Sequence, residues 1–261
     1  MSNSSQLGVG GKVALALSLT TMGGFVDAVG YIALFQVFTA NMSGNSIHIG
    51  MYLSQHDWRN FLRPMCAVLS YVVGMLLTRI ALEIAGREGR RHIASWTFAV
   101  EALLLLLFAR ATPTMHLGQI VDLHSPGYFG LVAVLAFAMG VQTATLTHVG
   151  ALTIYTTFVT GTLTKMTESL TRIIFWAVDQ FQQTGISHIV RNAPGQKDVR
   201  EGAMLASVWT AYVLGAALGA FSKTRWELRA LYVPVAVLVG FILLDLFRPI
   251  DVEEVKKQTG S

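Results

Sequence analysis

Residues 24–50 read GFVDAVGYIALFQVFTANMSGNSIHIG, an apolar run followed directly by a segment of mixed polarity. The run, residues 24–37, is apolar except for Asp27 and, near its end, Gln36. The segment after it, residues 38–50, is too polar for an ordinary membrane helix and too apolar for a surface loop. It combines glycine with short hydroxyl and amide side chains, namely Thr39, Asn41, Ser43, Gly44 and Asn45. What this segment does depends on whether it lies in water or in lipid.

The composition indicates lipid. Of 261 residues, 53% are hydrophobic and 13% are charged, whereas a soluble domain carries roughly a quarter charged residues. Six apolar runs are suited to crossing roughly 30 Å of hydrocarbon as helices: they lie at about 13–36, 64–85, 94–109, 128–148, 202–222 and 229–247. The sequence therefore predicts an all-α polytopic membrane protein with about six transmembrane helices.

Charge between these runs predicts the orientation. The first run contains Asp27 and is followed by no small-residue cleavage site, so we expect a mature helix rather than a signal peptide. With the N-terminus inside, the cytoplasmic side receives most of the basic residues, which are Lys12, Arg87, Arg90, Arg91, Arg191, Lys197, Arg200, Arg248, Lys256 and Lys257. Both termini are therefore expected to be cytoplasmic.

A second stretch resembles the first. Residues 140–166 read GVQTATLTHVGALTIYTTFVTGTLTKM. One gap places Gly24 over Gly140, Ala28 over Ala144, and Ser43-Gly44-Asn45 over Thr160-Gly161-Thr162. This similarity predicts a single membrane domain, residues 1–261, built from two repeats and a solvated tail. The repeats cover about 12–111 and about 127–248, and the tail is 249–261.

The crossing count decides how the repeats are related. If residues 38–50 and their counterpart enter the membrane only partway, each half crosses three times and the halves are inverted. If they cross fully, each half crosses four times and the halves are parallel. The charge tally does not decide between the two, because the second arrangement moves Arg59, Arg63 and Arg110 inside while the cluster Arg87, Arg90 and Arg91 goes outside, which leaves the tally almost unchanged. The tight cluster of Arg87, Arg90 and Arg91 favours six crossings plus two interrupted or half-helix segments.

Both interruptions predict a helix start at membrane depth. Residues 37–42 and 153–158 are β-branched or short and polar, which favours extended backbone, and each precedes a good N-cap, Ser43 or Thr160. Such backbone is tolerated in a bilayer only when it is buried in protein or lines a wet cavity. A helix N-terminus carries free N–H groups and partial positive charge. The two starts can therefore hold an anionic or strongly dipolar solute.

We expect the solute-binding residues on and around these two segments. They are Asp27, Thr39, Asn41, Ser43, Gly44, Asn45, Gln142, Thr157, Thr160, Gly161 and Thr162. The same small-residue motifs can instead let helices approach closely and hydrogen-bond across the contact, with no ligand at all. Both interpretations remain open from the sequence.

Two acids lie deep in apolar helices. A carboxylate such as Asp27 costs on the order of 3 kcal/mol at a helix centre on insertion scales, so it should face the protein interior. It is a candidate group for proton or cation coupling, or a structural carboxyl that caps the broken segment of its own half. The aligned residue in the second half is Thr143, so only one acid would titrate at this pair of sites. Glu101 is either a site or a neutral acid packed against a neighbouring helix.

Chemistry other than transport receives little support. The chain has one cysteine, Cys66, which cannot alone make a thiolate metal site. No HExxH or GxSxG motif is present. We therefore expect no enzyme activity, catalytic residue, metal site or cofactor.

The two motif blocks, GFVDAVGY with FTANMSGNSIHIG and GVQTA with TTFVTGTLTKM, resemble those of the YoaK family, bacterial multi-pass membrane proteins of unknown function. The similarity extends over nearly the whole chain. Ser43, Ile47 and Thr143 depart mildly from the family pattern. The resemblance implies an inner-membrane protein and supplies no known ligand. The pairing of an extended segment with a short helix is also similar to nucleobase and sulfate transporters, at the level of architecture only.

These observations predict a secondary transporter of a small polar or anionic solute across the inner membrane. A channel is a close alternative, and a non-transporting scaffold or assembly protein is another. The expected partners are the lipid bilayer and a small-molecule or ion solute. A homo-oligomer is an open alternative, because the sequence does not determine the oligomeric state. Nucleic acid is not expected, because the basic residues lie where membrane topology explains them.

Overall fold

The computed structural model describes residues 8–90, 92–111, 122–145, 148–149, 152–153, 159–184, 191–248 and 250. The helices are α1 (Val9–Ala33), α2 (Met42–Ser54), α3 (Trp58–Arg87), α4 (Ile93–Ala111), α5 (Pro126–Thr145), α6 (Val159–Thr184), α8 (Lys197–Trp226) and α9 (Tyr232–Phe247). Two short 3-10 helices, η2 (Ala193–Gly195) and η3 (Glu227–Leu231), flank α8. The strands β1 (His148–Val149) and β2 (Leu152–Thr153) pair antiparallel.

Every expected apolar run contains a helix, so the predicted all-α membrane fold is confirmed. Five stretches of the described residues are long and apolar enough to cross a membrane. Four of them correspond to α1, α3, α4 and α5, and the fifth, of 51 residues, contains α8, η3 and α9. The run expected at about 64–85 begins earlier, because the Asp57 side chain accepts the Asn60 amide and caps α3. Hydrogen bonds from Asn60 hold the pKa of Asp57 below its usual value.

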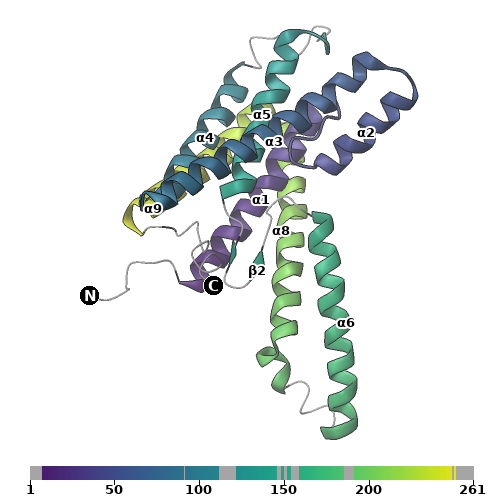
Figure 1. Cartoon of the computed structure of the whole chain (residues 1–261), viewed down its shortest axis with the longest axis vertical. Helices are drawn as coiled ribbons and strands as arrows, with labels where there is room; N and C mark the ends of the chain where they lie inside the picture. Colours follow the sequence, from purple (N-terminus) through teal and green to yellow (C-terminus); the bar gives the residue numbers. More distant parts are fainter. Residues whose placement is uncertain are drawn as a thin grey trace.

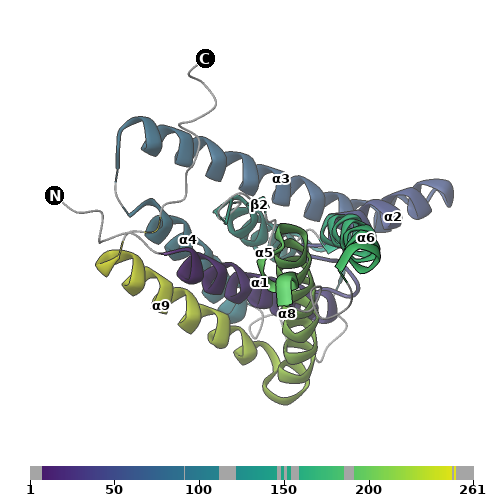
Figure 2. The ribbon, with the colours of Figure 1, turned by 90° about the horizontal axis from the view of Figure 1, so that it is seen from below.

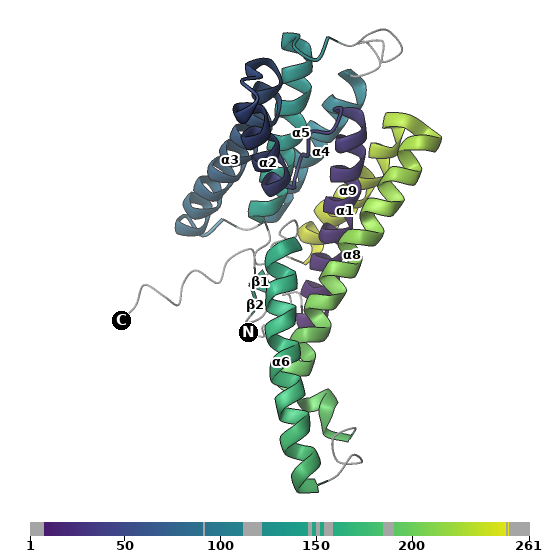
Figure 3. The same cartoon turned by 90° about the vertical axis from the view of Figure 1, so that its right-hand side faces the viewer.

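The helix after the second interruption is longer than expected. We expected a short helix after Thr160, whereas α6 has 26 residues. The physical reason is local: no glycine or proline interrupts the sequence from Thr162 until Gly185. Figures 1 and 3 show α6 extending beside the first half of α8, away from the other helices.

The core is a bundle in which the two halves pack on each other. The most extensive helix contacts join α1 to α8 and α3 to α5, while α2 packs on α3 and α6 on α8. Seen from below, α4 and α5 lie between α3 and α9 (Figure 2). The helices α1 and α5 run in opposite directions, and α2 and α6 lead away from the centre toward opposite ends of the molecule (Figure 1).

In the contact of α1 with α8, and in that of α5 with α3, the two helix backbones approach each other closely. A Cβ on Gly24 would collide with the carbonyl oxygen of Tyr212, and a Cβ on Gly140 would collide with the carbonyl oxygen of Tyr71. Gly24 and Gly140 are the glycines aligned between the two halves of the sequence. Glycine at such a point lets two helices touch and adds dispersion contacts.

A second pair of glycines lies at the same two crossings, on the partner helices α8 and α3. Gly215 of α8 lies against the Thr21 carbonyl of α1, and Gly74 of α3 lies against the Phe137 carbonyl of α5. In both helices the glycine follows the tyrosine by three residues: Gly74 follows Tyr71 in α3, and Gly215 follows Tyr212 in α8. The two crossings therefore share one arrangement of glycines and carbonyls.

Candidate functional site

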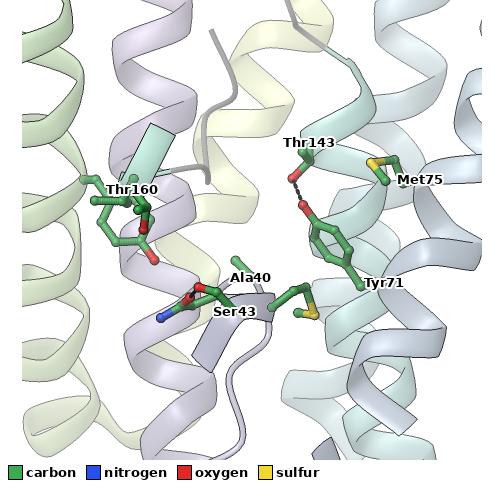
Figure 4. Close-up of a pocket in the computed structure, with 10 residues that line it drawn as sticks. Ala40, Ser43, Tyr71, Met75, Thr143 and Thr160 are labelled. Carbon is green, nitrogen blue, oxygen red and sulfur yellow. Dashed lines mark hydrogen bonds between the residues drawn. The ribbon is translucent and has the colours of Figure 1, made fainter. Parts of the chain in front are cut away.

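A cavity of about 560 Å³ lies where the two interrupted segments meet. Its lining residues come from both halves: Ala40, Asn41, Met42, Ser43, Tyr71, Met75, Thr143, Val159, Thr160 and Tyr212. Figure 4 shows Ser43 and Thr160, from the starts of α2 and α6, across the space from Tyr71 and Met75. The two helix starts that we expected to be neighbours thus share one cavity.

The start of α2 differs in detail from the expectation. The helix begins at Met42, and Asn41 rather than Ser43 caps it: Oδ1 of Asn41 accepts the Gly44 amide at 3.3 Å and the Ser43 hydroxyl at 2.8 Å. Asparagine is among the strongest N-caps. The Met42 amide donates to the Ala40 carbonyl. In this turn the Ser43 amide is left without an acceptor among the described residues.

At the other start, α6 begins at Val159, one residue before the expected cap Thr160. Thr160 is exposed and lines the cavity. Gly161 is half-buried, and Thr162 is buried and not among the lining residues. Thr157 lies outside the described residues.

Asp27 lies directly behind the cavity wall. Its Oδ1 accepts three hydrogen bonds, from the amides of Thr39 and Ala40, both at 2.8 Å, and from the Thr39 hydroxyl at 3.1 Å. Its Oδ2 accepts the Tyr212 hydroxyl at 2.8 Å. Asp27 is 3% exposed and is not among the lining residues, whereas Ala40 and Tyr212 are. The carboxyl therefore caps the broken segment of its own half and ties it to α8.

A buried arginine holds the same segment from the carbonyl side. The Arg63 guanidinium donates to the carbonyls of Leu34 and Phe35, and the Tyr128 hydroxyl also donates to the Leu34 carbonyl, at 2.7 Å. Phe35 and Gln36 adopt positive φ angles of 51° and 68°. From the sequence, Arg63 was expected only to contribute to the charge that sets the topology, because no local pattern connects it with the residues after α1.

The second half carries an uncharged counterpart of the Asp27 contact. The Tyr71 hydroxyl donates to Oγ1 of Thr143 at 2.9 Å, and Thr143 in turn donates to the Met139 carbonyl at 2.8 Å. Thr143 is the residue aligned with Asp27. Each tyrosine thus lines the cavity and bonds to the residue at this aligned position. Neither tyrosine was among the expected site residues, because its only signal in the sequence is a hydroxyl within an apolar helix.

Several expected binding residues support the wall instead. Asn45 is fully buried, donating to the Phe38 carbonyl at 2.7 Å and accepting the Phe38 amide at 3.0 Å. Gly44 leaves room for the Phe38 ring. Gln142 donates to the Leu19 carbonyl at 2.6 Å, and its side-chain oxygen has no partner among the described residues. Like Thr39, these residues are not among those that line the cavity.

Glu101 is a separate feature of α4. It is 0% exposed, and neither carboxyl oxygen has a hydrogen-bond partner among the described residues. An isolated charge at such a position would be very costly, so a neutral acid fits this environment. Within the described part of the chain, no three His, Cys, Asp or Glu side chains cluster as metal ligands would.

Comparison with known proteins is consistent with this membrane fold. The family model described as "Protein of unknown function (DUF1275)" matches residues 15–244. The chain is similar to the UPF0700 transmembrane protein YoaK of Bacillus subtilis (strain 168), with 22% identity over 225 residues that cover 84% of this chain and 88% of that protein. No solved structure matches significantly. The expected resemblance to YoaK is confirmed, and this multi-pass membrane protein belongs to the DUF1275 family.

Proposed function

We propose that this protein is a secondary transporter that moves a small polar or anionic solute across the bacterial inner membrane, with both termini in the cytoplasm. The observation that carries the proposal is the cavity lined by Ser43 of α2 and Thr160 of α6. Broken helices from corresponding positions of two halves commonly form transporter binding sites near the bilayer midplane.

We further propose that the halves are inverted structural repeats. Supporting this, α1 and α5 run in opposite directions, and the contact of α1 with α8 has a counterpart in that of α5 with α3. The glycines Gly24 and Gly140 each lie against a tyrosine carbonyl at these crossings. In such an arrangement the cavity lies between the repeats, where rocking of one against the other exposes it to alternate sides.

The lining indicates the class of solute. The Thr160 hydroxyl can donate or accept, and the Ser43 amide adds a donor at a helix start. The hydroxyl oxygens of Ser43 and Tyr212 can accept, since their protons are donated to Asn41 and Asp27. Met75 and Val159 add apolar surface. A volume of about 560 Å³ lies within the usual range for small-molecule sites, about 300–1,000 Å³. The donors favour an anionic or dipolar solute.

Asp27 is the proposed coupling group. It lies behind the wall formed by Ala40 and Tyr212 and bonds to both. A change in its charge therefore acts on the two groups that separate it from the cavity. Proton or cation movement would be linked to solute binding through these contacts.

A scaffold function is favoured by one observation: Asn45 and Gly44 fix the Phe38 backbone and ring rather than facing the cavity. The two functions make different demands on Ser43. A scaffold needs only that the segment packs, whereas a transporter needs the cavity to remain open.

A thermal-shift screen with small polar and anionic solutes separates them. Since a ligand stabilises the folded state by mass action, we expect a solute that raises the melting temperature of the wild type and fails to raise that of Ser43→Leu. Ser46→Leu, on an exposed position of α2 outside the lining, should keep the shift. A solute that stabilises all three proteins equally, or a broad panel with no effect on the wild type, would contradict the proposal.

A further inference from the structure

Tyr212 occupies the position between Asp27 and the cavity. It is half-buried, lines the cavity and donates its hydroxyl to Oδ2 of Asp27 at 2.8 Å. Since Asp27 is not among the lining residues, a solute in the cavity meets the tyrosine rather than the carboxyl.

The hydrogen bonds of Asp27 determine where a proton can bind. Oδ1 already accepts the amides of Thr39 and Ala40 and the Thr39 hydroxyl. An ionised carboxylate only accepts hydrogen bonds, whereas a protonated one carries a single O–H donor. An arriving proton is therefore accommodated on Oδ2, the oxygen that faces Tyr212.

Protonation at Oδ2 reverses the direction of the bond between these two residues. The carboxylate accepts the phenol proton when it is ionised, and the carboxylic acid donates its own proton to the phenol oxygen when it is neutral. One proton enters at Asp27 and none leaves Tyr212, which stays neutral in both states. The phenol O–H of Tyr212 then no longer donates to Asp27, and it is available to a hydrogen-bond acceptor in the cavity.

We infer that Tyr212 is a positioning residue that relays the protonation state of Asp27 to the cavity, presenting a hydrogen-bond donor there only when Asp27 is protonated. The inference rests on the proposed transport function and extends it by naming the group through which proton and solute communicate. When Asp27 is protonated, the cavity should therefore prefer solutes that accept a hydrogen bond.

The other half supplies a natural comparison. The hydroxyl proton of Thr143 is engaged by the Met139 carbonyl, so its oxygen accepts from Tyr71. Thr143 has no carboxyl that titrates, and this bond keeps its direction. Of the two equivalent tyrosines, only Tyr212 changes its role with pH.

In the part of the chain that the structure describes, few ionisable groups lie near Asp27. The elements packed against α1 are α8, α5, η3, α9 and β1. Tyr212 is the ionisable residue bonded to Asp27, Glu227 and Arg229 of η3 are exposed, and Asp245 of α9 accepts from Ser95 and Ile250. From α5, Gln142 and Thr143 face this region without a titrating group. The side chain of His148 in β1 lies outside the described residues.

Vibrational spectroscopy of the full-length protein tests the relay without a known solute. The Raman doublet of Tyr212 is obtained by subtracting the spectrum of Tyr212→Phe from that of the wild type. As the pH falls, this doublet should change from the signature of a hydrogen-bond donor to that of an acceptor. The infrared carbonyl band of protonated Asp27 should grow over the same pH range. In Asp27→Asn the Tyr212 signature should not vary with pH, and the difference between wild type and Tyr71→Phe should be pH-independent.

Three results would overturn the inference. They are a Tyr212 signature that is constant with pH, one that still titrates in Asp27→Asn, and no Asp27-dependent carbonyl band at any pH at which the protein stays folded. If Asp27→Asn does not fold, Tyr212→Phe decides: the carbonyl band of Asp27 should shift because the acid loses its acceptor, and an unshifted band contradicts the relay. Because these readouts need no solute, a failure of the relay is distinguishable from a failure of transport.

Discussion

Asp27 on α1 and Tyr212 on α8 are joined by a 2.8 Å hydrogen bond at a helix crossing where Gly24 lies against the Tyr212 backbone. One residue of α8 thus supplies both the carbonyl that touches α1 and the hydroxyl that bonds its buried acid. At the other crossing, Tyr71 supplies both groups to α5. The wall of the cavity is therefore continuous with two close helix crossings, that of α1 with α8 and that of α3 with α5.

Replacing Asp27 with leucine should destabilise the protein strongly. The substitution removes the acceptor of the Thr39 and Ala40 amides, and each buried donor left unpaired costs about 1–3 kcal/mol. Thermal unfolding in detergent should show a clearly lower melting temperature. Asp27→Asn keeps an acceptor oxygen and should lose less. Equal stability of Asp27→Leu and the wild type would show that these hydrogen bonds contribute nothing.

Glu101→Leu should have the opposite effect. Both carboxyl oxygens of Glu101 lack hydrogen-bond partners among the described residues. Leucine is of similar size and apolar, so the substitution removes a buried unsatisfied group that costs about 1–3 kcal/mol of stability. We expect a melting temperature equal to or above that of the wild type. A marked loss of stability would indicate that Glu101 has a bonding partner.

Gly24→Ala tests the close crossing of α1 with α8. The added Cβ would meet the Tyr212 carbonyl, and overpacking of this kind costs typically about 1–3 kcal/mol. Gly240→Ala in α9 is the matched control, because a Cβ there has nothing within 4 Å. It should be neutral or mildly stabilising. The same loss of melting temperature in both variants would refute the close contact at Gly24.

Arg63→Met should release the segment after α1. Hydrogen bonds from charged groups contribute about 1.5–3 kcal/mol, and Arg63 donates to the carbonyls of Leu34 and Phe35. Limited proteolysis or hydrogen exchange should show greater opening of residues 34–41. The control is Arg59→Met, at an exposed position about one turn earlier in the same helix. Unchanged protection in Arg63→Met would show that Arg63 does not hold this segment in place.

Local sequence signals explain what could be predicted. Apolar runs gave the helices, and the run of short polar residues around Asn41 gave the break before α2. The alignment of Asp27 with Thr143 identified positions that both receive a tyrosine hydroxyl. The partners themselves could not be predicted, because Tyr212 and Arg63 reach the first half from other helices and leave no local pattern. The sequence did not distinguish Asn41 from Ser43 as the cap of α2, because asparagine and serine are both strongly preferred N-caps.

The most direct test of the central claim is solute flux into proteoliposomes by a variant whose cavity is filled. Ser43→Leu combined with Thr160→Leu should abolish the uptake seen with the wild type while the protein remains folded. Ser46→Leu combined with Thr164→Leu, at exposed positions of the same two helices outside the lining, should leave uptake unchanged. Uptake that persists when the cavity is filled would contradict a solute site between the two helix starts.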